Sequence, residues 1–153
     1  MAVNPEVSRV KVEKELERAA SSAQRRGWQL QWDPNALFLR ASITAPDNEV
    51  YIFEFHFDDY PEIPPLIDAI HPETGERNTA QCFPTGGSGY FHSSNRICAY
   101  WSRNAYTAGG PHAGNWVMGD WASKDPLRKE LGLILTLLAD FLEDTSYKGR
   151  KPS

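Results

Sequence analysis

Three consecutive segments between residues 28 and 57 alternate apolar and polar side chains with a period of two. In a β-strand this period places the apolar side chains on one face and the polar ones on the other. The apolar positions are Trp28, Leu30 and Trp32, then Leu37, Leu39, Ala41 and Ile43, then Tyr51, Phe53, Phe55 and Phe57. Turn-forming residues separate the segments at 33–35 and 46–48. The pattern predicts an antiparallel meander with one buried face, to which residues 66–70 add a short fourth strand.

Two segments with helical spacing lie before and after this meander. In the first, Asn4 suits the capping position, Pro5 the first helical position and Gly27 the position after the last turn. The second begins at 125–126 and repeats apolar residues at helical spacing as far as residue 142. The predicted fold class is therefore α+β, a four-stranded antiparallel meander covered on one face by an N-terminal helix and one long C-terminal helix.

The chain of 153 residues has the length of one domain. We expect a single domain over 1–153, with a folded core at about 5–144 and a frayed tail at 145–153. The second half of the chain contributes one long helix to this core, and no internal repeat divides the sequence.

Composition narrows the class of protein. No apolar run approaches the roughly 18 residues that a membrane span needs, so we expect no membrane partner. The net charge of −4 argues against a nucleic-acid partner. Two cysteines are too few for a disulfide scaffold, which favours a reduced, cytoplasmic chain.

Regular periodicity is absent between residues 71 and 124, which predicts a long irregular segment. Segments of this kind inside a compact domain are usually functional. This one holds both cysteines and three of the four histidines, and its densest stretch is residues 89–101, around Cys98. Because a thiolate is a strong nucleophile, Cys98 is the candidate reactive residue, although buried cysteines are often inert.

The order of these features resembles that of ubiquitin-conjugating enzymes. Tyr60-Pro61-Glu62-Ile63-Pro64-Pro65 is similar to the proline signature of that family, and Ile97-Cys98 to its catalytic-cysteine dipeptide. Trp121-Ala122, followed by the helix from Pro126, resembles its Trp-Ser-Pro segment and second helix. The likeness covers about residues 5 to 144 and is closest to compact bacterial relatives encoded beside ubiquitin-like proteins, some of them in antiphage operons.

This resemblance implies a UBC-like fold with a long active-site loop and an acyltransferase activity. The enzyme would accept a ubiquitin-like modifier protein from an activating enzyme as a thioester on Cys98. It would then pass the modifier to an amine of a protein target, in antiviral defence. The charged face of the first helix, with Lys11, Lys14 and Arg18, would dock the activating enzyme. The resemblance implies no cofactor and no metal.

The sequence departs from the family around the cysteine. The family has His-Pro-Asn shortly before it, with the asparagine supporting the active site, whereas this chain has His71-Pro72-Glu73 far upstream. Asn95 is therefore the first candidate for the supporting amide, and Asn104 is another. His92 either contacts the reacting groups or hydrogen-bonds the backbone of its own loop.

Three other interpretations stay open. A zinc site would use Cys82, His92 and Cys98 with His71 or His112, although no closely spaced ligand pair is present. A cysteine hydrolase would pair Cys98 with His92 or His112 and release its acyl group to water. A non-catalytic adaptor of the same fold would bind the ubiquitin-like protein without using Cys98.

Overall fold

The computed structural model describes residues 2–86, 89–106, 121 and 130–152. Helix α1 (Pro5–Arg26) has the expected ends: Asn4 Oδ1 accepts a hydrogen bond from the Glu6 amide at 2.9 Å. Gly27 follows the last turn with φ 74°, a left-handed conformation that glycine adopts without a steric cost. Among the described residues, none of the helices has both the length and the apolar composition needed to cross a membrane.

The four-stranded sheet has the order β1-β2-β3-β4 with every neighbouring pair antiparallel, which confirms the predicted meander. Its strands are β1 (Gln29–Asp33), β2 (Phe38–Thr44), β3 (Val50–His56) and β4 (Leu66–Ile70). Leu39 pairs with Phe55 and Ala41 with Phe53, so the buried side chains of β2 and β3 lie side by side. The register follows from the period of two, because a shift of one residue would expose every buried side chain.

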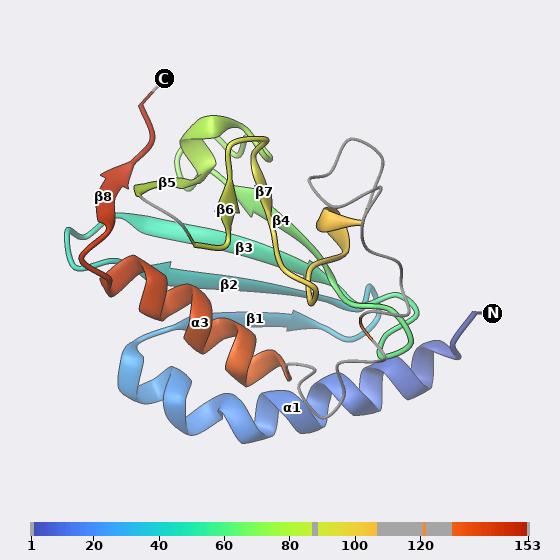
Figure 1. Cartoon of the computed structure of the whole chain (residues 1–153). Helices are drawn as coiled ribbons and strands as arrows, with labels where there is room; N and C mark the ends of the chain where they lie inside the picture. Colours follow the sequence, from blue (N-terminus) through green and yellow to red (C-terminus); the bar gives the residue numbers. More distant parts are fainter. Residues whose placement is uncertain (1, 87–88, 107–120, 122–129, 153) are drawn as a thin grey trace.

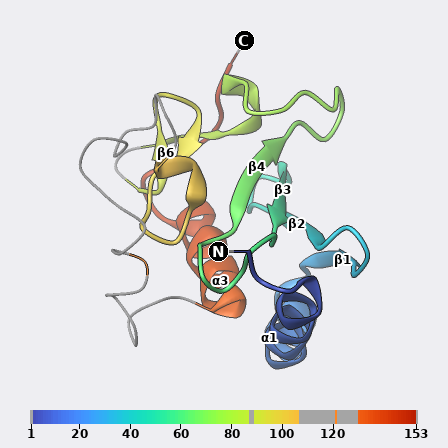
Figure 2. The same cartoon turned by 90° about the vertical axis from the view of Figure 1, so that its right-hand side faces the viewer.

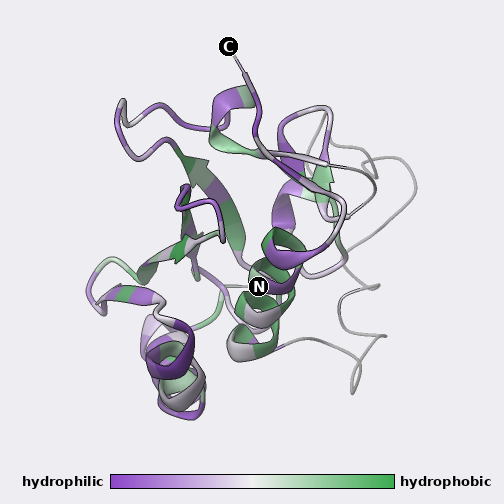
Figure 3. Cartoon of the chain, turned by 90° about the vertical axis from the view of Figure 1, so that its left-hand side faces the viewer, coloured by the Kyte–Doolittle hydropathy of each residue, from purple (hydrophilic) through white to green (hydrophobic). Residues whose placement is uncertain are grey.

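Helix α3 (Leu131–Glu143) packs on this apolar face, with α1 beside it below the β1 edge (Figures 1 and 2). Figure 3 shows hydrophobic colour on the strands and along α3, whereas α1 is largely hydrophilic or neutral. The two helices approach closely where a Cβ on Gly132 would lie 3.3 Å from the Cβ of Ala19. The α+β class, with an N-terminal and a C-terminal helix on an antiparallel sheet, is therefore confirmed.

Residues 71–106 contain more regular structure than their sequence predicts. They form a 3-10 turn η1 (Ala80–Cys82), three short strands β5 (Pro84–Gly86), β6 (Phe91–His92) and β7 (Arg96–Ile97), and a second 3-10 turn η2 (Arg103–Ala105). These elements are too short to show a period. The rest of the expected active-site loop and the expected helix start at 125–126 lie outside the described residues.

The C-terminal tail, expected to be frayed, instead forms strand β8 (Tyr147–Arg150) antiparallel to β5. Arg150 anchors it, because its side chain hydrogen-bonds the carbonyl oxygens of Gln81 and Val50 and lies over the Tyr51 ring at 4.4 Å from the centroid. A pairing with a strand about 60 positions earlier leaves no local signal in the sequence, so the tail reads as polar and unstructured.

The opposite face of the sheet carries no helix from the described part of the chain (Figure 2). Glu54 points to this face, as predicted, yet its side chain is only 4% exposed because Arg40 and Arg77 cover it at 2.6 and 2.7 Å. These two ion pairs hold the pKa of Glu54 below its usual value despite the opposing effect of burial, which is the largest single contribution.

Glu15 on α1 is a buried carboxylate that joins three parts of the chain. It accepts hydrogen bonds from the Tyr60 hydroxyl at 2.8 Å and from the Leu131 amide at 2.7 Å, and Lys11 Nζ lies 3.6 Å away. The Leu131 amide is one of the unpaired donors at the start of α3, so Glu15 completes that helix end. Burial raises the pKa of Glu15, and these three partners oppose that rise only in part.

Glu15→Gln is expected to flatten the dependence of stability on pH. A raised pKa means that the folded state holds the proton more tightly than the unfolded state. The resulting stabilisation is complete below the ordinary value of 4.5 and is lost as the pH rises through the raised pKa of Glu15. Urea unfolding from pH 4 to 8 should therefore show the wild type losing stability relative to Glu15→Gln. A constant difference between the two proteins would contradict the shift.

Candidate active site

Cys98 lies at the end of a small antiparallel ribbon formed by β6 and β7. Phe91 pairs with Ile97 and His92 with Arg96, and the Cys98 amide donates to the Tyr90 carbonyl at 2.6 Å. Tyr90 is therefore the residue directly opposite Cys98. Side chains opposite each other in an antiparallel pair have their Cβ atoms roughly 5 Å apart. The Cys98 and Tyr90 side chains therefore leave the ribbon next to each other and on the same face.

The ribbon has a core face and an outer face. Ile97 is 1% exposed, and the Phe91 ring packs against Phe53, Phe83 and Phe141, with centroids 6.0, 6.0 and 4.9 Å away. Because side chains alternate along a strand, the residues on either side of these two face outward. Cys98 is accordingly half-buried, whereas the second cysteine, Cys82, is fully buried. The thiol therefore sits at the surface on a ribbon that aromatic packing fixes to the core.

Burial raises the pKa of the Cys98 thiol above its ordinary value of 9.0. Partial removal from water disfavours the charged thiolate, and burial is the cause of the shift. At neutral pH the thiol is therefore mainly protonated. This differs from cysteine hydrolases, in which a neighbouring imidazolium stabilises the thiolate.

His92 and Asn95 lie at the other end of the ribbon, in its turn. The His92 Nδ1 atom accepts from the Ser94 amide at 3.1 Å, and the Asn95 amide donates to the His92 carbonyl at 3.0 Å. Asn95 has φ 61°, the left-handed conformation that closes this turn. Three extended residues span about 10 Å, so the backbones of Asn95 and Cys98 are separated by that order of distance. His92 makes the loop contact that was one of its two predicted roles.

The segment after Cys98 is fixed to the proline-rich segment 60–65. The Arg103 amide donates to the Pro65 carbonyl at 2.9 Å, and its side chain donates to the Pro64 carbonyl at 3.0 Å and to Asp58 at 3.1 Å. Trp121 is fully buried and donates to the Pro61 carbonyl at 2.7 Å. The prolines have no backbone N–H to donate. Their carbonyl oxygens accept hydrogen bonds from Arg103 and Trp121, which follow Cys98 in the chain.

Asn104, the other candidate amide, has a structural contact. Its Oδ1 accepts from the Ile67 amide at 2.8 Å and from the Ser102 hydroxyl at 3.2 Å. On the same edge of β4, Asn78 Oδ1 accepts from the Ala69 amide at 2.9 Å. Two asparagine side chains thus satisfy the outward amides of β4, which ends the sheet beside the ribbon.

Two residues that sequence reasoning missed matter most to this site. Tyr90 is opposite Cys98, and its ring lies 5.2 Å from that of Trp101. Arg103 holds the chain five residues after the thiol. The Ser-Ser-Asn turn at 93–95 is the signal that could have placed Tyr90, because a hairpin closing there pairs residue 90 with residue 98.

The three predicted docking residues on α1 have different surroundings. Lys14 is exposed and borders a groove of about 510 Å³ together with Lys11 and the exposed apolar residues Val7 and Val10. Arg18 is instead paired with Glu130 at 2.7 Å and lies outside this groove. The structure therefore brings Lys11 and Lys14 together with apolar surface but directs Arg18 toward the start of α3.

The proposed zinc ligands do not converge in the part of the chain that the structure describes. Cys82 Sγ donates to the Glu76 carbonyl at 3.2 Å, and His71 Nδ1 accepts from the Glu73 amide at 3.1 Å. No group of three or more histidine, cysteine or acidic side chains among the described residues is arranged to hold a metal ion. His112 lies outside these residues.

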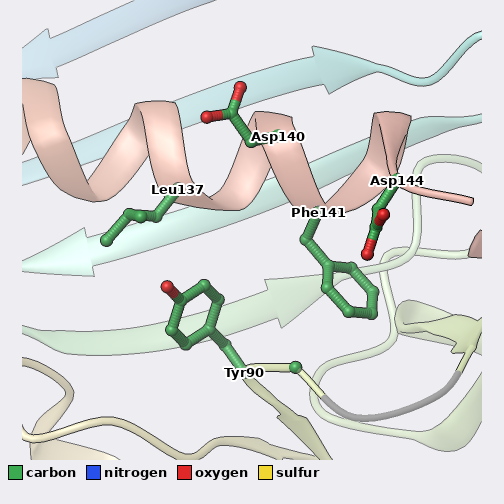
Figure 4. Close-up of a pocket in the computed structure, with 6 residues that line it drawn as sticks. Tyr90, Leu137, Asp140, Phe141 and Asp144 are labelled. Carbon is green, nitrogen blue, oxygen red and sulfur yellow. The ribbon is translucent and has the colours of Figure 1, made fainter. Parts of the chain in front are cut away.

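A groove of about 520 Å³ adjoins the Cys98 end of the ribbon. Tyr90 and Gly89 form one wall, and Leu137, Asp140 and Phe141 of α3, with Asp144 just after its end, form the other. Figure 4 shows Leu137 and Phe141 extending from α3 toward the side on which Tyr90 lies, with the Asp144 carboxylate on that side as well. A Cβ on Gly89 would lie 2.0 Å from Phe141 Cε2, so only glycine allows the backbone to pass this close to the ring.

Alkylation by iodoacetamide should report the raised pKa of Cys98. Because the thiolate is the reacting form, the rate should rise about tenfold per pH unit up to at least pH 9. Intact-mass measurements after timed quenching give the rate, and the urea-unfolded protein should level off at a lower pH. Cys98→Ser serves as the control, because buried Cys82 should leave that variant unmodified. A plateau below pH 8 in the folded wild type would contradict the shift.

Comparisons of the chain with models of protein families, with curated proteins and with solved structures give no match. What the protein does must therefore be inferred from its own residues. Those residues offer a half-buried thiol on a fixed ribbon, beside a groove on α3.

Proposed function

We propose that this chain is a conjugating enzyme of the ubiquitin type, which carries a ubiquitin-like modifier as a thioester on Cys98. The observation that carries the proposal is the half-buried Cys98 thiol at the end of a ribbon anchored to the core. An acyl carrier needs a thiol that another polypeptide can reach but that is held in one place. Cys98 meets both needs, whereas Cys82 is held in place but has no exposed surface and cannot be reached.

The raised thiol pKa supports a carrier rather than a hydrolase. A thiolate of high pKa is a poorer leaving group than one of low pKa, so the thioester on Cys98 resists attack by water. The described histidine closest in sequence, His92, is opposite Arg96 in the ribbon and accepts from the Ser94 amide. It is therefore not the oriented base that a hydrolase requires.

The order of elements agrees with the UBC-like fold that the sequence motifs suggest. The first helix, the meander, the proline-rich segment and the cysteine follow one another, and the last helix packs on the sheet. The prolines, the residues after Cys98 and Trp121 meet through hydrogen bonds. Motifs separated by up to 60 positions are thus joined by hydrogen bonds, which supports the proposal.

In this mechanism the Cys98 thiolate attacks the activated carboxyl of the modifier, and the activating enzyme's thiolate leaves. An amine of the target then attacks the thioester carbonyl, an amide forms, and the Cys98 thiolate is released and takes up a proton. The attacking amine creates an oxyanion, and a neutral donor beside it is worth on the order of 3 kcal/mol. The backbone of Asn95, the candidate from the sequence, lies on the order of 10 Å from that of Cys98, so in the proposed mechanism the donor is a group closer to the thiol.

Incubation with an activating enzyme, a ubiquitin-like modifier and ATP should give a thioester on Cys98. On a non-reducing gel the wild type should shift by the mass of the modifier, and thiol reductant should remove the shift. Cys98→Ser should give a reductant-resistant ester, and Cys98→Ala no shift. Cys82→Ser is the matched control and should charge normally.

The activating enzyme must be shown to accept the modifier on its own cysteine first. If it then fails to charge the wild type, the proposal is wrong. An adaptor that binds the modifier without a thioester would instead keep its cellular function in Cys98→Ala.

We further propose that the groove on α1, lined by Val7, Val10, Lys11 and Lys14 together with Asn4 and Glu6, docks the activating enzyme. Lys14→Glu should lower the initial charging rate about tenfold, because it reverses one charge beside exposed apolar surface. Arg18→Ala should have a smaller effect, since Arg18 is paired with Glu130. Lys148→Glu, an equal charge change at an exposed position of β8, is the control. Equal loss in Lys14→Glu and Lys148→Glu would exclude docking at this groove.

A further inference from the structure

The groove between Tyr90 and α3 has the chemistry of a site for a basic side chain. Its walls include two aromatic rings, Tyr90 and Phe141, and the aliphatic Leu137. Such rings attract a guanidinium or ammonium group and also cover its aliphatic stem. The groove therefore suits arginine or lysine better than a purely apolar or an acidic side chain.

The charges around the groove also favour a basic side chain. Asp140 and Glu143 share one guanidinium, Arg26, at 2.8 and 2.9 Å. In the part of the chain that the structure describes, Asp144 accepts only from neutral donors, chiefly the Thr145 amide and the Ser146 hydroxyl at 2.8 and 2.9 Å. Asp144 also caps the C-terminal end of α3, where the helix dipole adds negative potential. A cation entering beside Asp144 would thus meet negative charge that no cationic side chain among the described residues offsets.

We propose that this groove holds a basic side chain of the polypeptide that is acylated on Cys98. The inference rests on the proposed function. The charged head would lie at Asp144, and its stem would lie between the Tyr90 and Phe141 rings (Figure 4). Because Tyr90 is opposite Cys98 and an extended chain advances roughly 3.4 Å per residue, we place the basic residue a few positions before the acylated one.

The acylated tail fits this weak site better than the amine acceptor does. An exposed ion pair contributes too little to recruit a separate protein from solution. A tail tethered to Cys98 meets the groove at an effective concentration of the order of millimolar, so a weak contact is enough to orient it. The groove then sets which modifier tails stay ordered on the enzyme.

Exchange with synthetic peptide thioesters tests the inference without an activating enzyme. The probes are hexapeptide thioesters of 2-mercaptoethanesulfonate that carry one arginine, or its neutral analogue citrulline, at two, three or four positions before the C-terminal residue. The Cys98 thiolate attacks the thioester carbonyl, a new carbon–sulfur bond forms, and 2-mercaptoethanesulfonate leaves and takes up the proton. Intact mass at a fixed concentration of the leaving thiol gives the exchange equilibrium constant.

At one of the three positions, arginine should raise the equilibrium constant about 3- to 10-fold over citrulline at low salt. Asp144→Asn should bring this ratio close to one while leaving the citrulline value unchanged, because asparagine keeps an oxygen for the Thr145 amide. Glu62→Gln, the same charge change at an exposed site outside the groove, should keep the full ratio. Thermal unfolding checks that all three proteins are folded.

Two failures can be told apart. Equal constants for arginine and citrulline at every position, with Cys98 acylated by both, would overturn the groove assignment and leave the carrier function standing. An arginine preference that persists in Asp144→Asn would also overturn it. No acylation of Cys98 by any probe would overturn the proposed function and this inference together.

Discussion

Much of this structure depends on one buried carboxylate. Glu15 leaves water in the middle of a helix whose other acidic residues remain at least partly exposed, and such a group is stable only when its oxygens are bonded. Tyr60 and the Leu131 amide supply those bonds. The start of the proline-rich segment and the start of α3 must therefore both meet α1 at this point. The constraint fixes how the second helix lies on the sheet.

From Tyr60 the constraint extends to the thiol along the proline-rich segment. Its carbonyl oxygens accept from Trp121 and from Arg103, and Arg103 holds the chain that leaves Cys98. On the other side, Phe91 fixes the ribbon to the sheet and to α3. Cys98 is thus held from both directions, although its ribbon contains only two short strands. This arrangement lets a surface residue keep a defined position without being buried.

The sequence predicts those parts of the fold that repeat along it. The period of two in β2 and β3 and the caps Asn4 and Gly27 are local signals, and the structure confirms them. Glu15 could not be found in this way, because it lies among charged residues of an amphipathic helix and its partners are 45 and 116 positions away. Strand β8 could not be predicted from the sequence for the same reason. Its pairing with β5 joins two segments that have low strand propensity, and only their meeting in space stabilises them.

The residues of the candidate site also divide into those with a local sequence signal and those without one. Cys98 could be chosen from its motif, whereas Tyr90 and the α3 wall of the groove follow only from the ribbon register and the packing of the last helix. In the proposed acyl carrier, these features would link protection of the thioester with selection of its tail. Tyr90 packs on Trp101, and partial burial raises the pKa of the Cys98 thiol, which in the proposed carrier would slow loss of the acyl group to water. The same Tyr90 side chain also lines the groove that would orient the acylated tail. Protection of the thioester and selection of its tail would therefore depend on one aromatic residue.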